Sequence, residues 1–380
     1  MCKDVVAFLI FLFAATPSNA QQGIDSLMIH HQYDRVVEKL LQYDTLSISE
    51  RTHLAEAQQK LGKLYDALDS YTALYRADSN HAYLLQQARI LEKVDEDPKA
   101  LQVYIQLNKL EQENVYYWKL TARSAYKNAS FPFSLQAWKE VHQRNPEDLE
   151  AIDKMALLYN KLDQPALADS LLKKGLQIAP EAKFLKRSRI KTLYRLRKYQ
   201  ALVDLADELF MQGDSNLVVQ KIAGIANYHE KNYPKCLLLL GKVAEVETGS
   251  ELVHFYMGLA YRDSGDNEEA GTYLEKAIEL SVSKNIGNYY TQLAVNFEEA
   301  GETAKAIQAY KVAYSESKNK ILLYHLARNY DSYYKDKKVA LTYYERYLQE
   351  KDTANEYLMN YSMHRIQELK NAAHFEGKSF

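Results

Sequence analysis

Small residues recur along the chain in pairs whose two members lie twelve positions apart. Seven pairs keep this spacing, an eighth is one residue longer, and most first members follow one another after 33 to 36 residues. Two antiparallel helices that cross closely need small residues where they touch. Each pair therefore predicts one helix-turn-helix unit of a repeat. The pairs are Ala55/Ala67, Ala88/Ala100, Ala122/Ser134, Ala156/Ala168, Gly224/Cys236, Gly258/Ala270, Ala294/Ala306 and the longer Ala327/Ala340.

The clearest unit surrounds Gly258 and Ala270. These two residues lack bulk, so two helix backbones can approach each other, and Tyr261 and Leu274 are expected to fill the space beside the contact. The segment Ser264–Asn267 between them consists of residues that favour turns. This unit predicts two helices joined by a tight turn.

A second regularity lies four positions after the second small residue of each pair, where an aromatic residue or leucine recurs. The gap of 68 residues between two successive pairs equals two periods, so a degenerate repeat is expected around Lys191 and Tyr194, with Leu202 and Leu209 on its second helix. The recurring residues are Tyr71, Tyr104, Trp138, Leu172, Leu240, Leu274, Tyr310 and Tyr344.

This combination of small and aromatic positions resembles the tetratricopeptide repeat (TPR), whose period is about 34 residues. The resemblance implies an all-α fold, a right-handed α-solenoid of about nine helix-turn-helix repeats with capping helices at its ends. It covers residues 48–353. Residues 21–47 are expected to form a partial repeat, and residues 354–380 a capping helix and tail with Tyr357, Leu358, Tyr361, Ile366 and Leu369 at helical spacing.

Residues 1–20 are typical of a cleaved secretory signal peptide. Lys3 precedes an apolar run from Val5 to Ala15, and small residues end the segment at Ala20, so Gln21 is the expected mature N-terminus. The apolar run is shorter than the roughly 20 residues that span a bilayer. No transmembrane span is expected after cleavage, and an uncleaved membrane anchor is the alternative.

Cysteine use indicates the compartment of the mature chain. Only Cys236 remains after cleavage, at a small helix-crossing position, and is expected to be a buried, inert thiol. An exported protein without disulfides fits a bacterial periplasm. Secretion from a eukaryotic cell is the alternative, because Asn128-Ala129-Ser130 and Asn360-Tyr361-Ser362 match the glycosylation triplet.

The resemblance also implies a binding surface, because in TPR proteins the first helix of each repeat lines the concave groove. The resemblance implies that the groove positions lie three residues before the first small residue and one, four and five residues after it. Over six repeats, nine of these 24 positions hold Lys or Arg and three hold Asp or Glu. A positive groove would favour an acidic protein or peptide. The candidate binding residues are Arg89, Lys119, Arg123, Tyr126, Lys127, Lys161, Arg195, Lys221, Tyr228 and Arg262.

Two alternatives to a binding role stay open for these basic residues. Lysine and arginine are good helix formers on any solvated face, and the register of the repeats could be misplaced. Chaperone-binding TPR proteins clamp a peptide carboxylate with lysines and asparagines. Lys119 matches the first lysine of that clamp, but Arg123 stands where asparagine is expected, which argues against that function.

The 31 tyrosines divide between packing and contact roles. Those at repeat packing positions, such as Tyr71, Tyr159, Tyr194, Tyr261, Tyr310 and Tyr330, are expected in the core. The remainder offer large amphipathic contact areas. The candidates of this second kind are Tyr116, Tyr117, Tyr126, Tyr228 and Tyr324.

The sequence contains no pattern that indicates catalysis. No H-E-x-x-H helix, zinc-spaced cysteine–histidine cluster or glycine-rich phosphate loop is present, so we expect no metal, no cofactor and no enzymatic activity. The net charge of −2 predicts no attraction to nucleic acid. We therefore expect an exported protein-interaction scaffold. The alternatives are a structural subunit of a cell-envelope assembly that acts through its convex face and a polysaccharide- or peptidoglycan-binding module.

Overall fold

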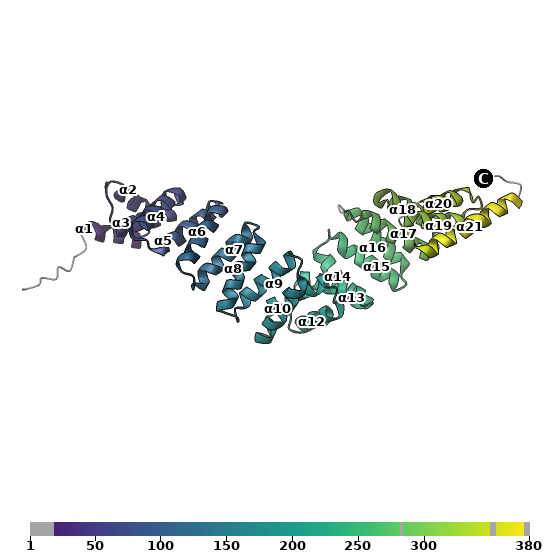
Figure 1. Ribbon diagram of the computed structural model, residues 1–380, viewed down its shortest axis with the longest axis horizontal. Helices are drawn as coiled ribbons and strands as arrows, with labels where there is room; N and C mark the ends of the chain where they lie inside the picture. The colour runs from purple at the N-terminus through teal and green to yellow at the C-terminus, as the bar shows by residue number, and fades with distance from the viewer. Residues whose placement is uncertain (1–18, 282–283, 350–354, 376–380) are drawn as a thin grey trace, which may run out of the picture. The chain divides into compact units, whose positions relative to one another are not determined.

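The computed structural model of the chain describes residues 19–281, 284–349 and 355–375, and every regular element in these ranges is an α-helix (Figure 1). The chain divides into two compact units, Met1–Ile178 and Ala179–Phe380. The predicted signal peptide lies outside the described ranges except for its last two residues, which begin α1. No helix in the described ranges is long and apolar enough to cross a membrane.

The first unit consists of five successive pairs of helices, drawn from purple to teal in Figure 1. The pairs are α1 (Asn19–Ile29) with α2 (Tyr33–Leu40), α3 (Ile48–Lys60) with α4 (Leu64–Asp78), α5 (His81–Lys93) with α6 (Asp97–Leu110), α7 (Val115–Lys127) with α8 (Phe131–Arg144), and α9 (Leu149–Lys161) with α10 (Pro165–Ile178).

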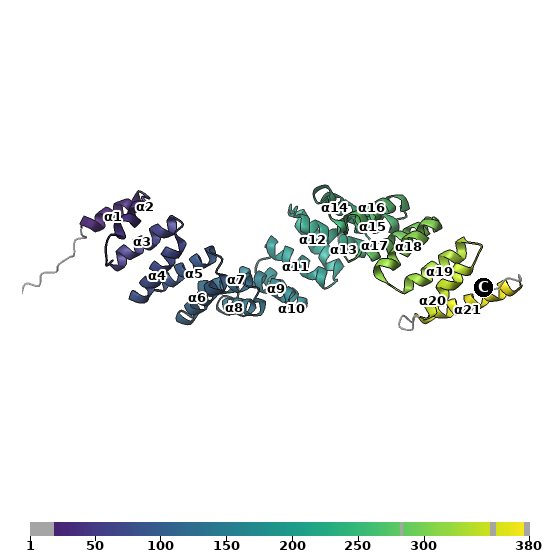
Figure 2. The same cartoon turned by 90° about the horizontal axis from the view of Figure 1, so that it is seen from above.

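The second unit consists of five further pairs and one terminal helix, and Figure 2 shows its successive pairs stacked side by side. The pairs are α11 (Lys183–Arg195) with α12 (Tyr199–Met211), α13 (Leu217–His229) with α14 (Tyr233–Val246), α15 (Glu251–Asp263) with α16 (Asn267–Leu280), α17 (Ile286–Glu299) with α18 (Thr303–Ser317), and α19 (Ile321–Tyr333) with α20 (Lys338–Gln349), followed by α21 (Glu356–Phe375). The described ranges therefore hold nine full pairs from α3 to α20, which confirms the predicted all-α repeat fold.

A single left-handed residue makes the turn inside nine of the ten described pairs. The φ angles of these residues lie between 54° and 95°. From Asp95 to Gly265 they recur every 34 residues, at Asp95, Ala129, Asp163, Arg197, Lys231 and Gly265. One residue with left-handed backbone angles lets the chain reverse direction between two helices in a short turn. The pair α19/α20, whose small residues are one position further apart, has no such residue in its described connection.

The two helices of a pair touch where the small residues were predicted. A Cβ atom added to Gly258 would lie 2.8 Å from the Cγ atom of Leu274, and one added to Gly224 would lie 2.6 Å from the Cδ2 atom of Leu240. Both leucines belong to the second helix of the pair and are fully buried. A larger side chain at either glycine would force the facing leucine to shift.

The degenerate repeat is α11/α12, and it replaces the small residues with bulky ones. Ile190 and Leu202 take the two crossing positions, and both are fully buried. Leu209 is also buried, as predicted, whereas Lys191 is exposed beside the crossing. The first-helix positions of this repeat are therefore counted from Ile190 and not from Lys191, which keeps Arg195 and adds Arg187 and Lys191 to the basic residues counted in the sequence.

The predicted core positions on the second helices are confirmed, whereas four of the six tyrosines expected in the core are only partly buried, namely Tyr159, Tyr194, Tyr261 and Tyr330. The eight aromatic or leucine residues that recur on the second helices are all buried, with at most 3% of their surface exposed. Cys236 is fully buried as well, and burial raises the pKa of its thiol to about 12. The core of each unit therefore lies between the first and second helices and continues from one pair to the next.

Helix α21 packs against the last pair of the second unit. Leu369 and Ala373 are buried, and Arg365 donates through Nε and Nη2 to the carboxylate of Asp331 at 2.7 and 3.1 Å. Of the five residues expected at helical spacing on this helix, Tyr357 and Tyr361 are exposed, at 73% and 40%. Tyr357 lies in the first turn of α21, before the side chains that reach the core.

We expect Gly258→Ala to lower the free energy of unfolding by about 1–3 kcal/mol, because the new methyl group would overlap Leu274. Gly241→Ala is the matched control, since a Cβ at Gly241 in the interior of α14 meets no atom within 4 Å. This control should gain about 0.5–1 kcal/mol from the better helix propensity of alanine. Urea denaturation measures both, and equal stability of the two variants would contradict the close crossing.

Candidate binding surface on the first helices

The predicted binding residues all lie on first helices of the repeats. In the first unit, α5 carries Arg89, α7 carries Lys119, Arg123, Tyr126 and Lys127, and α9 carries Lys161. In the second unit, α11 carries Arg195, α13 carries Lys221 and Tyr228, and α15 carries Arg262. We call the surface formed by these residues the first-helix face, and it exists separately in each unit.

Carboxylates of the next repeat neutralise the two central cations of α7. The Nζ atom of Lys119 lies 2.6 Å from Oδ2 of Asp148 and 3.1 Å from Oε2 of Glu150, and Nη2 of Arg123 lies 2.6 Å from Oε1 of Glu150. Asp148 is also the N-cap of α9, where it accepts from the backbone N–H of Ala151. The acidic side chains at the N-terminus of α9 therefore form ion pairs with the cations of the preceding first helix, α7.

These contacts shift the pKa values of the acidic partners. Burial alone would raise the pKa of Glu150, but hydrogen bonds from Arg123 and Lys119 outweigh burial and hold the pKa below its usual value. The pKa of Asp148 is lowered in the same way, by Lys119 and the backbone N–H of Ala151. Both groups are ionised at neutral pH and stabilise the folded state there.

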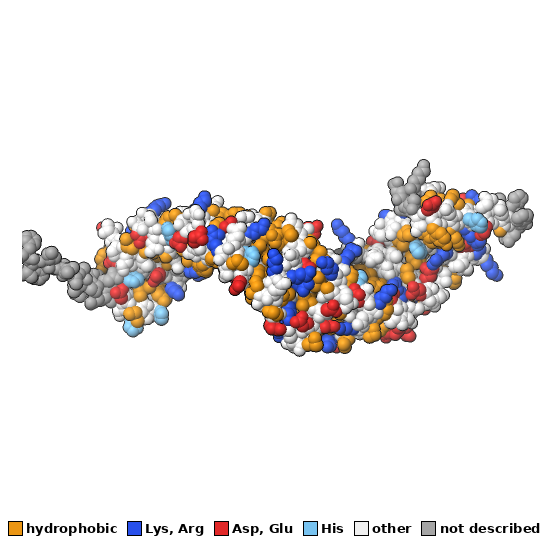
Figure 3. Space-filling model, turned by 60° about the horizontal axis from the view of Figure 1, so that its bottom comes forward, with side chains coloured by type: hydrophobic (Ala, Val, Ile, Leu, Met, Phe, Trp, Pro, Cys, Tyr) orange, Lys and Arg blue, Asp and Glu red, His pale blue; other side chains and the backbone are white. Residues whose placement is uncertain are grey.

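Other cations of the first-helix face have internal partners too. Lys127 Nζ lies 2.7 Å from Asp97, and Lys221 forms an ion pair with Glu247. Arg262 Nη2 lies 2.9 Å from its neighbour Asp263, and its Nη1 donates to Gln292 at 2.7 Å. Figure 3 accordingly shows basic and acidic side chains interspersed on the face in view.

The count of groove positions missed most of these acids. Asp97, Asp148, Glu150 and Glu247 lie at or near the beginnings of helices or in the connections, outside the 24 positions counted. A helix N-terminus favours acidic residues in any protein, so the sequence held no signal that these acids would reach across to the neighbouring cations. The positive potential expected from the count is therefore reduced by ion pairs between repeats.

Arg89 and Lys161 contact aromatic side chains instead of carboxylates. Arg89 Nη2 donates to the hydroxyl of Tyr116 at 2.9 Å. Lys161 Nζ lies over the rings of Phe131 and Tyr126, 4.8 and 5.6 Å from their centroids. Such cation–π contacts leave the positive charge available to a ligand. Arg195 is exposed at the end of α11.

The tyrosines expected on the surface fall into three groups. Tyr116 is 44% exposed, and Tyr126 and Tyr228 are half-buried, with the hydroxyl of Tyr228 donating to Asp263 at 2.9 Å. Tyr117 and Tyr324 are only 8% and 6% exposed, so the prediction that they are contact residues is wrong. Tyr117 packs against the preceding pair, α5 and α6, and Tyr324 packs against α20 of its own pair and against α21.

A pocket of about 180 Å³ opens on the first-helix face of the first unit, between α7 and α9. Trp138, Tyr126, Leu157 and Leu158 supply its apolar lining, and Arg123 and Lys154 supply positive charge. Leu157 is 39% exposed although it is apolar. An apolar pocket beside cations can hold an apolar side chain next to a carboxylate.

The sequence pattern located Arg123 and Tyr126 but missed Leu157 and Lys154. Leu157 is the first position after the small residue Ala156, one of the positions assigned to the groove. A leucine at a position expected to line the groove was therefore a signal in the sequence, and it was missed because only charged residues were counted. Lys154 lies outside the counted positions, and its Nζ is 3.5 Å from Asp153.

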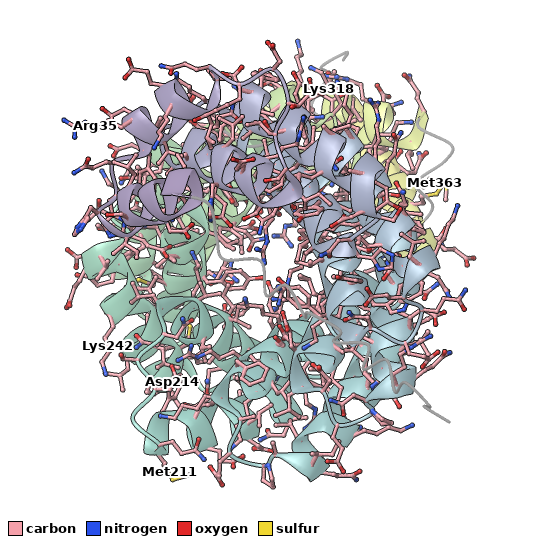
Figure 4. The ribbon with its side chains drawn as sticks, turned by 90° about the vertical axis from the view of Figure 1, so that its left-hand side faces the viewer. Arg35, Met211, Asp214, Lys242, Lys318 and Met363 are labelled. Carbon is pink, nitrogen blue, oxygen red and sulfur yellow. The ribbon has the colours of Figure 1, made fainter. Side chains whose placement is uncertain are left out.

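The second unit has two depressions on the side formed by its second helices. One, of about 670 Å³, lies beside Met211, Leu238 and Lys242, and Figure 4 shows Met211 and Lys242 pointing outward from the ribbon. The other, of about 460 Å³, lies between α16 and α18. Within the described residues, no group of three or more His, Cys, Asp or Glu side chains could hold a metal ion.

Because Asp148 and Glu150 have lowered pKa values, they hold protons less tightly in the folded chain than in the unfolded one. The stability they provide is complete above their unfolded pKa and is lost as the pH falls through the folded pKa. We expect Glu150→Gln to be less stable than the parent by about 1 kcal/mol at pH 7 and by much less at pH 3.

Urea denaturation at both pH values measures this difference, with Glu147→Gln in the connection before α9 as the control. If the parent and Glu150→Gln lost the same free energy of unfolding between pH 7 and pH 3, the ion pairs of Glu150 would not contribute to stability.

The comparisons with known proteins concern the repeat. Residues 251–315, from α15 into α18, match the sequence profile of the tetratricopeptide repeat. A tetratricopeptide repeat protein from Parabacteroides merdae is 17% identical, with 74% of this chain and 98% of that chain covered and a TM-score of 0.37. No curated protein matches the sequence significantly.

Two further solved structures have similar scores. MamA from Desulfovibrio magneticus RS-1 is 15% identical, with 44% of this chain and 94% of that chain covered and a TM-score of 0.41. A chain of the APC/C hetero-tetramer Cut9–Hcn1 is 10% identical, with 89% of this chain and 82% of that chain covered and a TM-score of 0.46.

Proposed function

Because the chain is a tetratricopeptide-repeat protein, we propose that it is a protein-interaction scaffold that binds a segment of a partner protein on its first-helix face. Tetratricopeptide repeats are typically scaffolds without catalytic activity, and we assign no reaction to this chain. Stacked repeats suit such a role because each one holds its exposed side chains at a fixed spacing from those of its neighbours.

The observation that carries this proposal is the pocket between α7 and α9. Its apolar walls come from Trp138, which is buried, and Leu157, which is exposed on the surface. An apolar side chain of the partner would cover Leu157 and fill the pocket, and burial of apolar area is the main favourable term in association. A buried anchor of this kind typically dominates a protein interface.

The charges around the pocket suggest an acidic group on the partner next to that anchor. The side chains of Arg123 and Lys154 are 51% and 43% exposed, so each can accept a second carboxylate in addition to its internal partner. Lys161 adds a third positive charge, which lies over aromatic rings. Since Glu150 already contacts Arg123, the partner's carboxylate would add specificity more than affinity.

One observation favours a second function, that of a structural subunit that acts through its second helices. Met211 is 82% exposed and Leu238 is 60% exposed beside the depression of the second unit. Exposed apolar side chains around a depression are typical of contact sites. A neighbouring subunit seated there would leave the first-helix face free.

We expect Leu157→Glu to abolish capture of a first-helix partner, because it places a charge at the mouth of the apolar pocket. Leu167→Glu is the matched control, since Leu167 is 51% exposed on α10, the second helix of the same repeat. A photo-crosslinking residue at position 157 and another at position 167 identify which face the captured protein touches.

A partner that crosslinks at 157 and is lost in Leu157→Glu alone supports the proposal. A partner retained by Leu157→Glu and lost in Met211→Glu assigns the contact to the second helices and rejects the first-helix face.

We further propose that the chain is exported, to the periplasm of a bacterial cell, on the strength of its residues 1–20. We expect the protein isolated from its native cell to begin at Gln21, as intact-mass spectrometry would measure. A chain that keeps Met1 and sediments with membranes would instead be anchored by an uncleaved segment. A soluble chain that keeps Met1 would contradict export.

A further inference from the structure

Cations and tyrosine rings alternate across the last two helix pairs of the second unit. Lys311 and Tyr314 lie one turn apart on α18, and Lys318 is the C-cap residue of the same helix. One tyrosine of α19 and a tyrosine and an arginine of α20 lie against them. We call the surface formed by these side chains the α18–α20 surface, and it consists of Lys311, Tyr314, Lys318, Tyr330, Tyr343 and Arg346.

Arg346 lies over two tyrosine rings at once. Its Cζ atom is 5.7 Å from the ring centroid of Tyr314 and 5.6 Å from that of Tyr343. The ring of Tyr343 in turn stacks on Tyr330, with 5.5 Å between the centroids. The Nη2 atom of Arg346 also donates to the hydroxyl of Tyr314 at 3.4 Å, the one hydrogen bond of this guanidinium among the described residues. The rings therefore orient the guanidinium and leave most of its N–H donors for a ligand.

The two lysines of this surface lie over rings as well. Lys318 Nζ is 5.9 Å from the ring centroid of Tyr314, and Lys311 Nζ is 5.5 Å from that of Tyr330. Four of the nine cation–π contacts in the described part of the chain thus involve the three cations of this surface. Such contacts occur on average about once per 70–80 residues, so their density here is well above average.

None of these three cations forms an ion pair with a carboxylate among the residues that the structure describes. The nearby carboxylates have other partners, since Asp331 pairs with Arg365 at 2.7 Å and Glu345 with Lys370 at 2.7 Å. Glu316, the only acid on α18, lies two positions after Tyr314, and helix side chains at that spacing do not face each other. The α18–α20 surface therefore keeps its positive charge, in contrast to the neutralised cations of α7.

Two exposed tyrosines extend this surface beyond the cations. Tyr334 stacks on Tyr330, with 5.3 Å between the ring centroids, and Tyr333 meets Tyr334 edge to face at 4.8 Å. Tyr333 is 52% exposed and Tyr334 is 43% exposed. Exposed tyrosines offer a large apolar area and a hydroxyl group to a protein partner.

We propose that the α18–α20 surface binds an acidic segment of a partner protein. A carboxylate can accept two parallel N–H bonds from an arginine, and the two lysines can hold further carboxylates on either side of it. Lys311 and Lys318 are seven residues apart, about 10 Å along the helix axis. An extended segment spans that distance in about three residues. A segment with several acidic residues can therefore reach all three cations.

The class of the partner rests on the proposed scaffold function, because a tetratricopeptide-repeat scaffold binds proteins. The site itself does not depend on the pocket between α7 and α9, which lies in the other unit. Leu157→Glu should therefore leave binding at the α18–α20 surface unchanged.

Fluorescence anisotropy at low ionic strength tests the proposal with the mature chain and a labelled Gly-Glu-Glu-Gly-Glu-Glu-Gly peptide. The control peptide has glutamine in place of glutamate, which keeps the shape of the side chain and removes the charge. We expect the acidic peptide to bind about tenfold more tightly than the control or better. Binding should weaken as salt is added.

Arg346→Gln should lower the affinity about tenfold, because a bidentate charged contact is lost. Arg346→Lys should restore only part of it, since an ammonium group cannot form two parallel bonds. Lys311→Gln and Lys318→Gln should each weaken binding about threefold. The matched control is Lys242→Gln, at an exposed lysine on α14 of the same unit, which should have no effect.

The role of the rings is tested at Tyr314. Tyr314→Leu removes a ring that orients Arg346 and should weaken binding about threefold although no charge changes. Tyr314→Phe keeps the ring and should bind as the parent does. The melting temperature of each variant shows whether the fold is retained, and the exposed Arg346 keeps the test decisive if Tyr314→Leu is unstable.

Equal binding of the glutamine peptide, or an equal loss in Lys242→Gln and Arg346→Gln, would overturn the proposal. Tighter binding of labelled polyuridylate or oligogalacturonate than of the acidic peptide would assign the surface to a nucleic acid or an acidic polysaccharide instead. If Leu157→Glu abolished peptide binding and Arg346→Gln did not, the acidic segment would belong to the first-helix face. That result would reject this site and support the proposed function.

Discussion

The close crossing of the two helices in each repeat is the constraint on which the rest of the structure depends. At Gly258 and Gly224 the second helix approaches until a leucine side chain occupies the space of the missing Cβ. That approach places the residue sixteen positions later, Leu274 or Leu240, in the core. It also leaves the opposite side of each first helix exposed, so the same contact that forms the core presents the candidate binding residues.

Ion pairs then join several repeats to their neighbours. Lys119 and Arg123 reach the acids at the start of α9, and Lys221 reaches Glu247 just before α15. Each ion pair joins a first helix to the connection that leads into the following one. Because these pairs are partly exposed, each adds modest stability. Their larger effect is to reduce the positive charge that a count of lysines and arginines predicts on the first-helix face. The apolar pocket at Leu157 is therefore a stronger argument for binding than the charge.

The first and second helices offer different chemistry. The first helices carry an apolar pocket with cations at its edge, and the second helices α18 and α20 carry cations that lie over tyrosine rings. Leu157 breaks a local rule, because it is apolar but exposed. Departures of this kind are expected at sites that serve a ligand.

The sequence by itself determined the fold and the positions of the core. The spacing of small residues located the helix pairs, and Trp138, Tyr104 and Tyr310 were correctly placed in the interior, because a repeated period tests the same packing position many times. Only the tertiary structure decided which side chains of neighbouring repeats contact one another. Nothing in the sequence places Glu150 beside Arg123 or Tyr117 in the core, since these contacts join neighbouring repeats and depend on how each helix is rotated against the next.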